Sequence, residues 1–449
     1  MTGRVPRPQT YEEWLVAEKP RQGAASFPDA PRQGAASLPN APRQGAASIP
    51  NAPRQGAASF PDAPRQGTFT LPEGYRLVLP AAAQLAPHAA HWFAQTIAES
   101  GADIVYSDED FLDLDGRRRD PVFKPAWSPE LFQYCDYLGG AYVTRDGVDP
   151  ASARRVVHIP RVLVHRSTPA WYESRPSSRP PASSLVSIII CSRTHELAGE
   201  CIEAIRGSTD YKNYEIILID HRADMQCLAE RFGAKRVAYN EDFNFARMCN
   251  HGVLAARGEL LLFLNDDTAP LHPEWMSLMA AQAERPDVGA VGAFLTFPDG
   301  RIQHAGVYIG TPNGAGHPGR LTRGRSIWPW LRMTREQLAV TGACLMMRRS
   351  VFDEIGGFDE RFPNNYNDVD LCLKCGQAGY KVILEAGARV EHRESKTRKT
   401  GIRYAERRRF LDRWADVLEC GDPYLNPNLT DNEDLLPDPE AFDRLGRWR

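Results

Sequence analysis

Acidic, amide and imidazole side chains stand at three separate places in the C-terminal half of this chain. An apolar run leads directly into Asn265-Asp266-Asp267. Further on, Asp368 opens a run with helical periodicity, and His392 closes a short apolar segment. A divalent cation held by oxygen ligands and an imidazole could neutralise a diphosphate. These residue types therefore predict a metal-dependent site for a phosphorylated substrate.

Apolar segments alternate with amphipathic ones from residue 185 onward. Strands are predicted at 185–191, 214–220 and 259–264, and helices at 197–207 and 244–256. Strands without polar residues, separated by helices, are typical of a parallel sheet covered on both faces. The sequence thus predicts an α/β fold with a mostly parallel sheet flanked by helices, and ligands bind such sheets at the carboxyl ends of the strands. The remaining predicted elements are a helix at 225–232 and strands at 235–239, 288–297, 338–348, 380–385 and 389–392.

Composition divides the chain into five parts. Residues 1–67 contain tandem eleven-residue repeats, each with two prolines and a glycine, which forbid a helix. We expect this tract to be disordered, and weak binding of a partner through its arginines is the alternative. A stretch rich in Pro and Ser at 173–184 is predicted to link a first folded part, 68–172, to a second, 185–400. Residues 401–449 are expected to form a C-terminal helix and tail.

Size and charge restrict the classes of function. With 449 residues and 42% hydrophobic content, the chain can bury more than one core. The net charge of −3 gives no general attraction to nucleic acid, so no nucleic-acid partner is expected. No apolar run is long enough to cross a membrane, the N-terminus lacks the pattern of a signal peptide, and the nine cysteines are scattered. We expect a cytoplasmic protein with reduced thiols, and peripheral association with the inner face of the cell membrane stays open.

The first folded part resembles the second in the order of its short motifs. The matching segments are Tyr75–Ala83 with Leu260–Thr268, Asp115–Arg117 with Asp299–Arg301, Gly139–Arg145 with Thr341–Arg348, and Val162–Arg166 with Arg389–Arg393. Alanines stand in the first part where the second has its acidic cluster. The first part is therefore predicted to be a degenerate partial copy of the second, without catalytic activity.

Several motifs of the second part follow one another in the order of a known family. They are Tyr214–Asp220, Phe243–Gly252, Leu264–Thr268, Thr341–Ala343, Gly356–Asp359 and Asn367–Leu371. In these motifs, residues 185–400 resemble the family 2 glycosyltransferases, and most of all bacterial tandem-domain members that build surface polysaccharides. The resemblance implies the GT-A fold and an inverting transfer of a sugar. The donor would be a nucleotide-diphosphate sugar, and the acceptor a glycan or lipid-linked glycan in polysaccharide or cell-envelope biosynthesis.

The resemblance also implies roles for individual residues. Asp267 is the expected ligand of Mg2+ or Mn2+, His392 completes the metal shell, and Asp368 is the general base. The residues expected to bind the nucleotide sugar are Ser192, Asp220, Asn244, Asn250, Asn265 and Asp266. Those expected on the acceptor side are Thr341, Gly342, Asn367 and Trp330. The chain departs from the family at Asn265, where an Asp is usual, and in the turns after Cys191 and Asp220.

Structural interpretations compete with these roles. Asp266-Asp267 could end a strand and cap a turn, Asn367 is a good N-cap, and His392 could be a packed side chain. Asp368 could simply complement the helix dipole. Arg301, His304 and the loop 311–337, with Trp328, Trp330 and several arginines, could contact the acceptor, because tryptophans suit stacking on sugar rings and arginines suit acceptor phosphates. The alternative is a solvated loop whose tryptophans anchor it in the core. The basic residues within 396–409 suit anionic lipid or lipid-linked diphosphate, or a solvated helix face.

Two other classes of protein compete with the enzyme. A non-catalytic carbohydrate-binding or assembly protein derived from a glycosyltransferase would account for the inactive first copy and for Asn265. A nucleotidyltransferase would need a basic, glycine-rich loop after the first strand, which Cys191-Ser-Arg-Thr194 does not supply. We therefore expect an enzyme whose partners are a nucleotide-sugar donor and a glycan acceptor.

Overall fold

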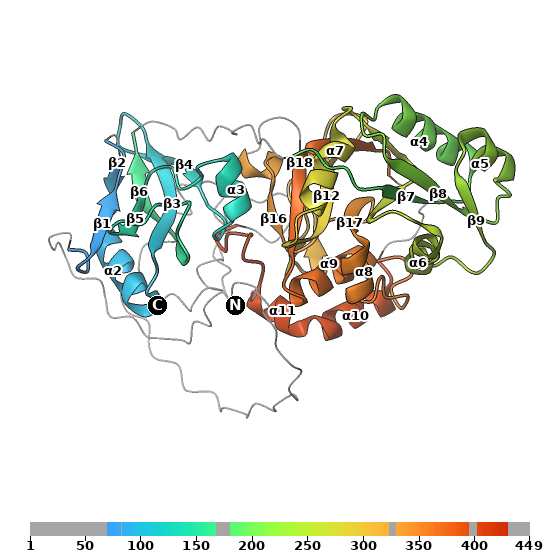
Figure 1. The fold of residues 1–449 in the computed structure, drawn as a ribbon. Coiled ribbons are helices and arrows are strands. Elements are labelled where there is room, and N and C mark those ends of the chain that lie inside the picture. The colour runs from blue at the N-terminus through green and yellow to red at the C-terminus, as the bar shows by residue number, and fades with distance from the viewer. Residues whose placement is uncertain (1–69, 82, 168–179, 323–328, 395–401, 430–449) are drawn as a thin grey trace.

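The computed structural model describes residues 70–81, 83–167, 180–322, 329–394 and 402–429. Within them the chain forms two units, each with its own sheet and helices, which lie side by side (Figure 1). The predicted repeat tract, most of the predicted linker, Trp328 and the basic residues 396–399 lie outside the described part of the chain.

The first unit is a six-stranded sheet with a helix packed on one face. Its elements are β1 (Tyr75–Val78), β2 (Ala83–Leu85), α2 (Ala89–Ser100), β3 (Ile104–Leu112), β4 (Arg118–Val122), α3 (Pro129–Tyr134), β5 (Tyr142–Arg145) and β6 (Val156–Arg166). Helix α2 buries Phe93 and Ile97 in a cluster with Val105 of β3 and Leu163 of β6. This small core is separate from the cores of the second unit.

The second unit is built on a ten-stranded sheet. Its first half comprises β7 (Val186–Ser192), α4 (His195–Gly207), β8 (Tyr214–His221), α5 (Gln226–Phe232), β9 (Lys235–Tyr239), α6 (Phe245–Ala255), β10 (Leu260–Asn265), β11 (Thr268–Pro270) and α7 (Trp275–Ala283). The elements that follow are β12 (Val288–Thr296), β13 (Ile302–His304), β14 (Tyr308–Ile309), β15 (Ala315–Gly316), the 3-10 helix η1 (Pro329–Arg332), β16 (Arg335–Gln337), β17 (Cys344–Arg348), α8 (Arg349–Glu354), α9 (Asn367–Gln377) and β18 (Lys381–His392). Helices α10 (Tyr404–Arg413) and α11 (Ala415–Cys420) come last. The predicted strands and helices between 185 and 264 are confirmed to within about two residues.

Apolar side chains on both faces of the second sheet are buried. Ile188 and Ile190 of β7 lie in a cluster with α4, α5 and α7, whereas Ile189 lies in a cluster with α6, α8 and α9. Because successive side chains of a strand point to opposite faces, a strand apolar at every position must be covered on both sides. The prediction of a sheet flanked by helices is thus confirmed.

The second sheet is mostly parallel, as expected, and includes the parallel pair β12 and β18, but antiparallel strands interrupt it. Strands β9, β8, β7 and β10 are parallel neighbours, but β17 lies antiparallel between β10 and β12. Strands β11, β13 and β16 also pair in an antiparallel sense. A continuous apolar run such as that of β17 fits a buried strand of either direction, so composition did not reveal the reversal.

The segments predicted as strands 380–385 and 389–392 form the single strand β18. The pairing with β12 shifts register between Glu385 and Arg389, so the residues between them bulge out. Gly387 in this bulge produced the break in the apolar pattern that suggested two strands. One long strand therefore carries His392 to the end of the sheet.

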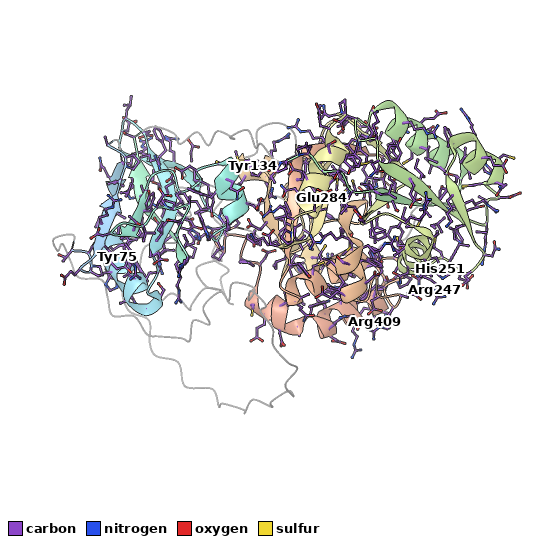
Figure 2. The ribbon with its side chains drawn as sticks, viewed as in Figure 1. Tyr75, Tyr134, Arg247, His251, Glu284 and Arg409 are labelled. Carbon is purple, nitrogen blue, oxygen red and sulfur yellow. The ribbon has the colours of Figure 1, made fainter. Side chains whose placement is uncertain are left out.

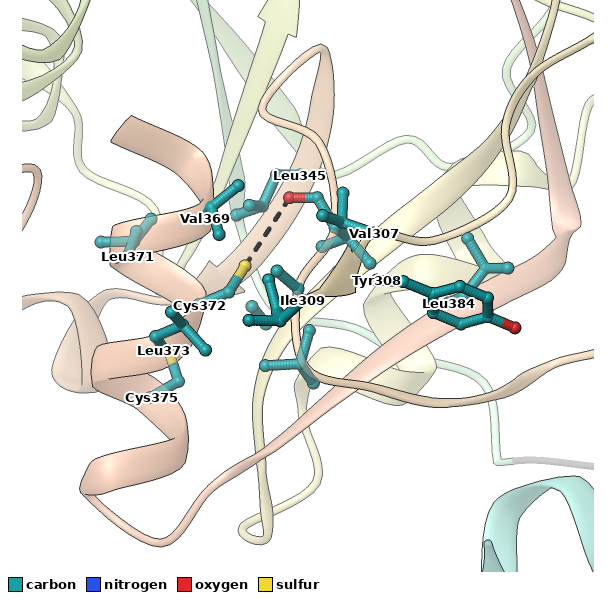
Figure 3. Packing of buried hydrophobic residues seen from close by; sticks show 14 of the residues in the cluster. Val307, Tyr308, Ile309, Leu345, Val369, Leu371, Cys372, Leu373, Cys375 and Leu384 are labelled. Carbon is teal, nitrogen blue, oxygen red and sulfur yellow. Dashed lines mark hydrogen bonds between the residues drawn. The ribbon is translucent and has the colours of Figure 1, made fainter. Parts of the chain in front are cut away.

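Helix α9 is fixed by an apolar face that packs against the second sheet (Figure 3). Val369, Cys372 and Leu373 are buried on it, and the Cys372 thiol donates to the carbonyl oxygen of Val340 at 3.7 Å (Figure 3). This packing sets the N-terminus of α9, with Asp368, against the Thr341–Gly342 turn.

The first sheet has the same strand order and strand directions as the part of the second sheet that excludes β7, β8, β9 and β16. The order β2-β6-β3-β5-β1, with β4 beside β3, corresponds to β11-β18-β12-β17-β10, with β13 beside β12. His165 of β6 pairs with Gln84, as His392 of β18 pairs with Thr268. The residue before Gln84 is Ala83, whereas the residue before Thr268 is Asp267. In the first unit His165 instead contacts Asp110, at 2.6 Å.

Buried polar contacts fasten the two units together. Gln282 of α7 donates to the hydroxyl of Tyr134 of α3 at 3.3 Å, at the junction seen in Figure 2. The C-terminal segment joins them as well, because the amide groups of Asn426 and Asn428 both donate to buried Asp108. Residues 422–429 thus lie between the units, where only a tail was expected.

Glu336 of β16 is a titratable group buried in this junction. It accepts hydrogen bonds from the Ser128 hydroxyl and from the backbone N–H of Glu130. Burial raises its pKa to about 7, although the hydrogen bond from Ser128 opposes the rise. A carboxyl group with a raised pKa stabilises the fold fully below its unfolded pKa and loses that contribution as the pH rises through its folded pKa.

Glu336→Gln should therefore raise the melting temperature more at pH 8 than at pH 5, by about 2–4 °C. As the pH rises between these values, the Glu336 carboxyl group ionises readily in the unfolded wild type but only at a cost in free energy in the folded wild type. The variant has no carboxyl group at this position and therefore no such cost. Differential scanning calorimetry of both proteins across this range tests the prediction. A difference in melting temperature that does not change with pH would contradict it.

Candidate active site

The candidate site begins at the turn between β10 and β11. Strand β10 is buried along its apolar residues, and its last residue, Asn265, pairs with Cys191 of the parallel strand β7. The carboxyl ends of β7 and β10 therefore meet at one edge of the sheet. This places Ser192 alongside the Asn265–Asp267 turn.

Asp267 and His392 are neighbours on this edge. Antiparallel pairing of Thr268 with His392 brings Nε2 of His392 to 3.1 Å from Oδ1 of Asp267. The side-chain nitrogen of Asn265 lies 3.3 Å from the same Nε2 atom. Both Asp267 and His392 are buried. The carboxylate and the imidazole are thus adjacent, as their predicted joint role requires.

Asp266 faces away from this pair and accepts a hydrogen bond of 2.6 Å from Ser192. Burial raises the pKa of Asp266 to about 6; the Ser192 hydrogen bond opposes the rise and the charge of Asp267 adds to it. The two adjacent carboxyl groups therefore have different surroundings and different partners.

Asp368 stands in the first turn of α9. Its Oδ2 accepts the backbone N–H of Gly342 at 2.8 Å, and its Oδ1 accepts that of Val369 at 2.9 Å. The expectation that Asn367 is the N-cap is wrong, since Tyr366 takes that position with a left-handed φ of 62°. The Tyr366 ring stacks on Phe410 of α10, which helps to hold this unusual backbone conformation.

A single turn connects Asp368 to the side of the site that holds Asp267 and His392. Gly342 donates to Asp368, and the next residue, Ala343, accepts the backbone N–H of Asn265 at 3.0 Å. Asn265 in turn contacts His392. The three side chains Asp267, His392 and Asp368 therefore belong to one continuous network at one edge of the sheet.

Gly342 is required by the close approach of Asp368. A Cβ atom at position 342 would lie 3.2 Å from the Cβ of Asp368. Gly342→Ala should displace Asp368 by a few tenths of an ångström and lower kcat/KM of a reaction catalysed at this site about tenfold. Steady-state kinetics test this, with Gly207→Ala as the control, because a Cβ there meets no atom within 4 Å. Wild-type kinetics in Gly342→Ala would contradict the placement.

Asp220 lies at the end of β8 and holds its own loop. Its carboxylate accepts the backbone N–H groups of Ala223 and Met225, and Nε of Arg236 at 2.6 Å. Burial works against its ionisation, but these hydrogen bonds and Arg236 outweigh burial and keep the pKa of Asp220 below its ordinary value. The carboxylate is thus ionised and well anchored.

Asn244 and Asn250 tie α6 to the segment that precedes α9. The Asn244 amide donates to the carbonyl of Glu360, and its oxygen caps α6 at the N–H of Arg247. Asn250 donates to the carbonyl of Phe358 and accepts the N–H of the same residue. Both side chains have a structural function in these contacts.

The residues predicted on the acceptor side fall into two groups. Thr341 and Gly342 lie in the turn beside Asp368. Asn367 is buried, and its amide donates to the carbonyl of Phe362. Trp330 is only 3% exposed and lies in the hydrophobic core, so the expectation that its ring stacks on a sugar is wrong. The sequence alone could not distinguish a tryptophan that stacks on a sugar from one that anchors the loop in the core, because only the structure shows its burial.

Sequence reasoning named His304 and the loop 311–337 as possible acceptor contacts but did not anticipate the contacts that their polar residues make next to this network. Arg320 donates to Glu394 at 2.7 Å, and Gln303 donates to the same carboxylate at 3.3 Å. His317 contacts His304, with 3.0 Å between their Nδ1 atoms. The spacing of these residues has no periodicity that would reveal their contacts.

Comparison with known proteins decides what kind of unit this is. Residues 187–356 match the family described as Glycosyl transferase family 2. These residues are a family 2 glycosyltransferase domain. The matched segment contains Ser192, Asp220, the Asn265–Asp267 turn and Gly342. The family match, together with the sheet flanked by helices, confirms the predicted GT-A fold class.

Known relatives extend over more of the chain than this glycosyltransferase domain. The O-antigen biosynthesis protein RfbC of Myxococcus xanthus is 31% identical over 431 residues, covering 78% of this chain and 33% of that protein. An uncharacterized protein of Sinorhizobium fredii is 33% identical and covers 77% of this chain and 47% of its own length. The N-acetylglucosaminyl-diphospho-decaprenol L-rhamnosyltransferase of Mycobacterium tuberculosis is 30% identical over 136 residues, 26% of this chain and 42% of that enzyme. The chain thus spans less than half the length of each of these relatives.

Solved glycosyltransferase structures resemble part of the chain. GalNAc-T7, determined with UDP, GalNAc and Mn2+, has a TM-score of 0.43 at 15% identity and covers 53% of this chain and 50% of its own. The mannosyltransferase PcManGT of Pyrobaculum calidifontis, in complex with GDP-Man and Mn2+, has a TM-score of 0.38 at 18% identity, covering 50% and 61%. Among the described residues of the present chain, no helix is long and apolar enough to span a membrane.

Proposed function

We propose that this chain is an inverting glycosyltransferase that moves a sugar from a nucleoside-diphosphate donor to a hydroxyl group of a glycan or lipid-linked glycan. The observation that carries this proposal is the network that joins Asp267 and His392 to Asp368 through Asn265 and the Gly342–Ala343 turn. Relatives named for O-antigen biosynthesis and for L-rhamnosyl transfer to a diphospho-decaprenol lipid support a role in the cell envelope.

Asp267 and His392 would hold a divalent cation, Mg2+ or Mn2+. Among the described residues no group of three or more His, Cys, Asp or Glu side chains could enclose a metal by itself. A carboxylate and an imidazole 3.1 Å apart nevertheless fit a cation that takes its other ligands from substrate phosphates and water. When bound, such a cation stabilises the negative charge that develops on the leaving nucleoside diphosphate.

Asp368 would act as the general base. Its two oxygens are oriented by the N–H groups of Gly342 and Val369, and each oxygen keeps a lone pair for another donor. Taking the proton of the acceptor hydroxyl while the new C–O bond forms gives a single displacement with inversion. Asp370, two residues on, is fully buried and accepts Nε1 of Trp414 at 3.0 Å, so it supports the helix instead.

The nucleotide would lie across the carboxyl ends of β7, β8 and β10. Ser192, Asp220 and Asp266 stand at these three strand ends. Asn244 and Asn250 would contribute indirectly, by holding the segment before α9 in place.

The first unit would be a degenerate partial copy that serves as a scaffold. Its strand order matches that of part of the second sheet, and Ala83 stands where the second unit has Asp267. The Asp110–His165 contact occupies part of the place that corresponds to the metal side. We also propose that the protein works in the cytoplasm at the inner face of the cell membrane, where a lipid-linked acceptor would be reached.

Binding of nucleotide sugars tests the proposal. Thermal stabilisation of the purified chain should appear with at least one of UDP-glucose, UDP-N-acetylglucosamine, GDP-mannose and dTDP-rhamnose, in the presence of MnCl2. The matched control is Asp353→Ala, which removes an exposed carboxylate on α8 and should respond like the wild type. If wild type and Asp267→Ala responded identically to every donor with and without Mn2+, the result would contradict the proposal and favour a non-catalytic carbohydrate-binding protein.

A further inference from the structure

His304 and His317 form a hydrogen-bonded imidazole pair beside the candidate site. Their Nδ1 atoms lie 3.0 Å apart, and the rings meet edge to face at 75°. His304 ends β13 and is fully buried, whereas His317 follows β15 and is partly exposed. Only one of the two rings can therefore reach a ligand from solvent.

Backbone donation determines which nitrogen of each ring carries the proton. The N–H of Thr341 donates to Nε2 of His304 at 3.4 Å, so that nitrogen must be unprotonated. The proton of a neutral His304 is then on Nδ1, from which it donates to Nδ1 of His317. His317 in its neutral form must carry its proton on Nε2. The chain of donors thus ends in an N–H group on the partly exposed ring.

Both rings are neutral near pH 7. Burial lowers the pKa of His304 well below its ordinary value, and the neighbouring His317, Arg335 and His392 add to this effect. Burial also lowers the pKa of His317, against the opposing charge of Asp368. A neutral pair keeps the order of donors fixed.

The same two-residue turn positions this pair and Asp368. Thr341 donates to His304, and the next N–H, that of Gly342, donates to Asp368. Among the charges that act on His317, that of Asp368 is the strongest. Glu394, the other acidic group near His317, already accepts Arg320 and Gln303. The His304–His317 contact and the Thr341–Gly342 turn therefore connect His317 to the proposed base.

We propose that His317 binds the acceptor by donating its Nε2–H to a hydroxyl oxygen of the acceptor sugar, and that His304 is a positioning residue that fixes the tautomer of His317. The inference rests on the proposed function, in which Asp368 takes the proton of the attacking hydroxyl. A neutral N–H donor suits an uncharged sugar hydroxyl better than the diphosphate of the donor, which would call for a cation. The contacts that link His317, through His304 and the Thr341–Gly342 turn, to Asp368 agree with this choice.

The tautomers can be measured without any substrate. In long-range 15N NMR spectra of histidine-labelled protein, assigned with single His variants, His304 should be protonated on Nδ1 and His317 on Nε2. In His304→Phe the His317 ring should lose this preference. A His317 ring protonated on Nδ1 in the wild type would overturn the inference.

The acceptor role is tested by how consumed donor is divided between transfer and hydrolysis. The probes are p-nitrophenyl glycosides of hexoses and 6-deoxyhexoses, offered with the nucleotide sugars named above. In His317→Leu the ratio of transfer to hydrolysis should fall about tenfold, as expected for one lost hydrogen bond, and His317→Gln, which keeps an N–H donor, should restore most of it. The control His91→Leu changes a partly buried histidine of the first unit and should match the wild type.

The outcomes separate the two proposals. If the wild type consumes no nucleotide sugar, the proposed function fails and the acceptor role fails with it. If it consumes a donor but His317→Leu divides that donor like the wild type, the proposed function stands and the inference about His317 is wrong. A wild type that only hydrolyses its donor across the whole panel would also contradict a sugar hydroxyl as the group bound at His317.

Discussion

Asp368→Asn should abolish most sugar transfer while the protein still binds its nucleotide sugar. Asn has nearly the size of Asp and keeps an oxygen that can accept the N–H of Gly342, so the start of α9 should remain in place. It cannot take a proton from the acceptor hydroxyl. The loss of a general base predicts a fall in kcat of about 10²–10⁴-fold.

Initial rates of transfer, measured beside donor affinity, test this expectation. Asp353→Asn on α8 is the matched control and should retain the wild-type rate. An Asp368→Asn variant that transfers sugar within a few-fold of the wild type would remove Asp368 from the chemistry. A variant that lost donor binding as well would indicate a structural role, such as support of the helix terminus.

Asp267→Ala should remove the dependence of donor binding on a divalent cation. The substitution leaves His392 without its carboxylate neighbour and leaves the diphosphate without the cation that would neutralise it. Because a bound cation is worth several kcal/mol, we expect affinity for the nucleoside diphosphate in MnCl2 to fall on the order of a hundredfold or more.

Calorimetric titration of UDP, GDP and dTDP into the protein, with MnCl2 and with EDTA, measures this effect. Asp115→Ala removes an exposed carboxylate of the first unit and serves as the control. The wild type should bind one of these nucleotides tightly only with the cation present. Equal affinities for wild type and Asp267→Ala in MnCl2 would show that the carboxylate holds no metal.

Elements formed by local pattern were predictable from the sequence. Strand β10 is apolar at every position before Asn265 and the acidic turn follows it directly, so its burial and its place at the sheet edge could both be expected. The strands β7, β8 and β9 were found for the same reason. Strand direction was not predictable, because β17 depends on long-range pairing with β10 and β12 that its own residues do not encode.

The candidate site divides in a similar way. Asp267 and Asp368 could be predicted because the local sequence pattern places one carboxylate at the end of a strand and the other at the start of a helix. Whether Asp220 or Asn250 is free to meet a ligand depends on partners far along the chain, such as Arg236 and Phe358. The contact between His304 and His317 needs the fold of the whole loop region. Tertiary contacts, rather than motifs, decide such roles.

Release of nucleoside diphosphate from nucleotide sugars in a single turnover tests most directly whether Asp267, His392 and Asp368 form one working site. With MnCl2 the wild type should release nucleoside diphosphate from at least one donor, and EDTA, Asp267→Ala or Asp368→Asn should each suppress the release. Release that continues unchanged in EDTA, or in either variant, would contradict the account.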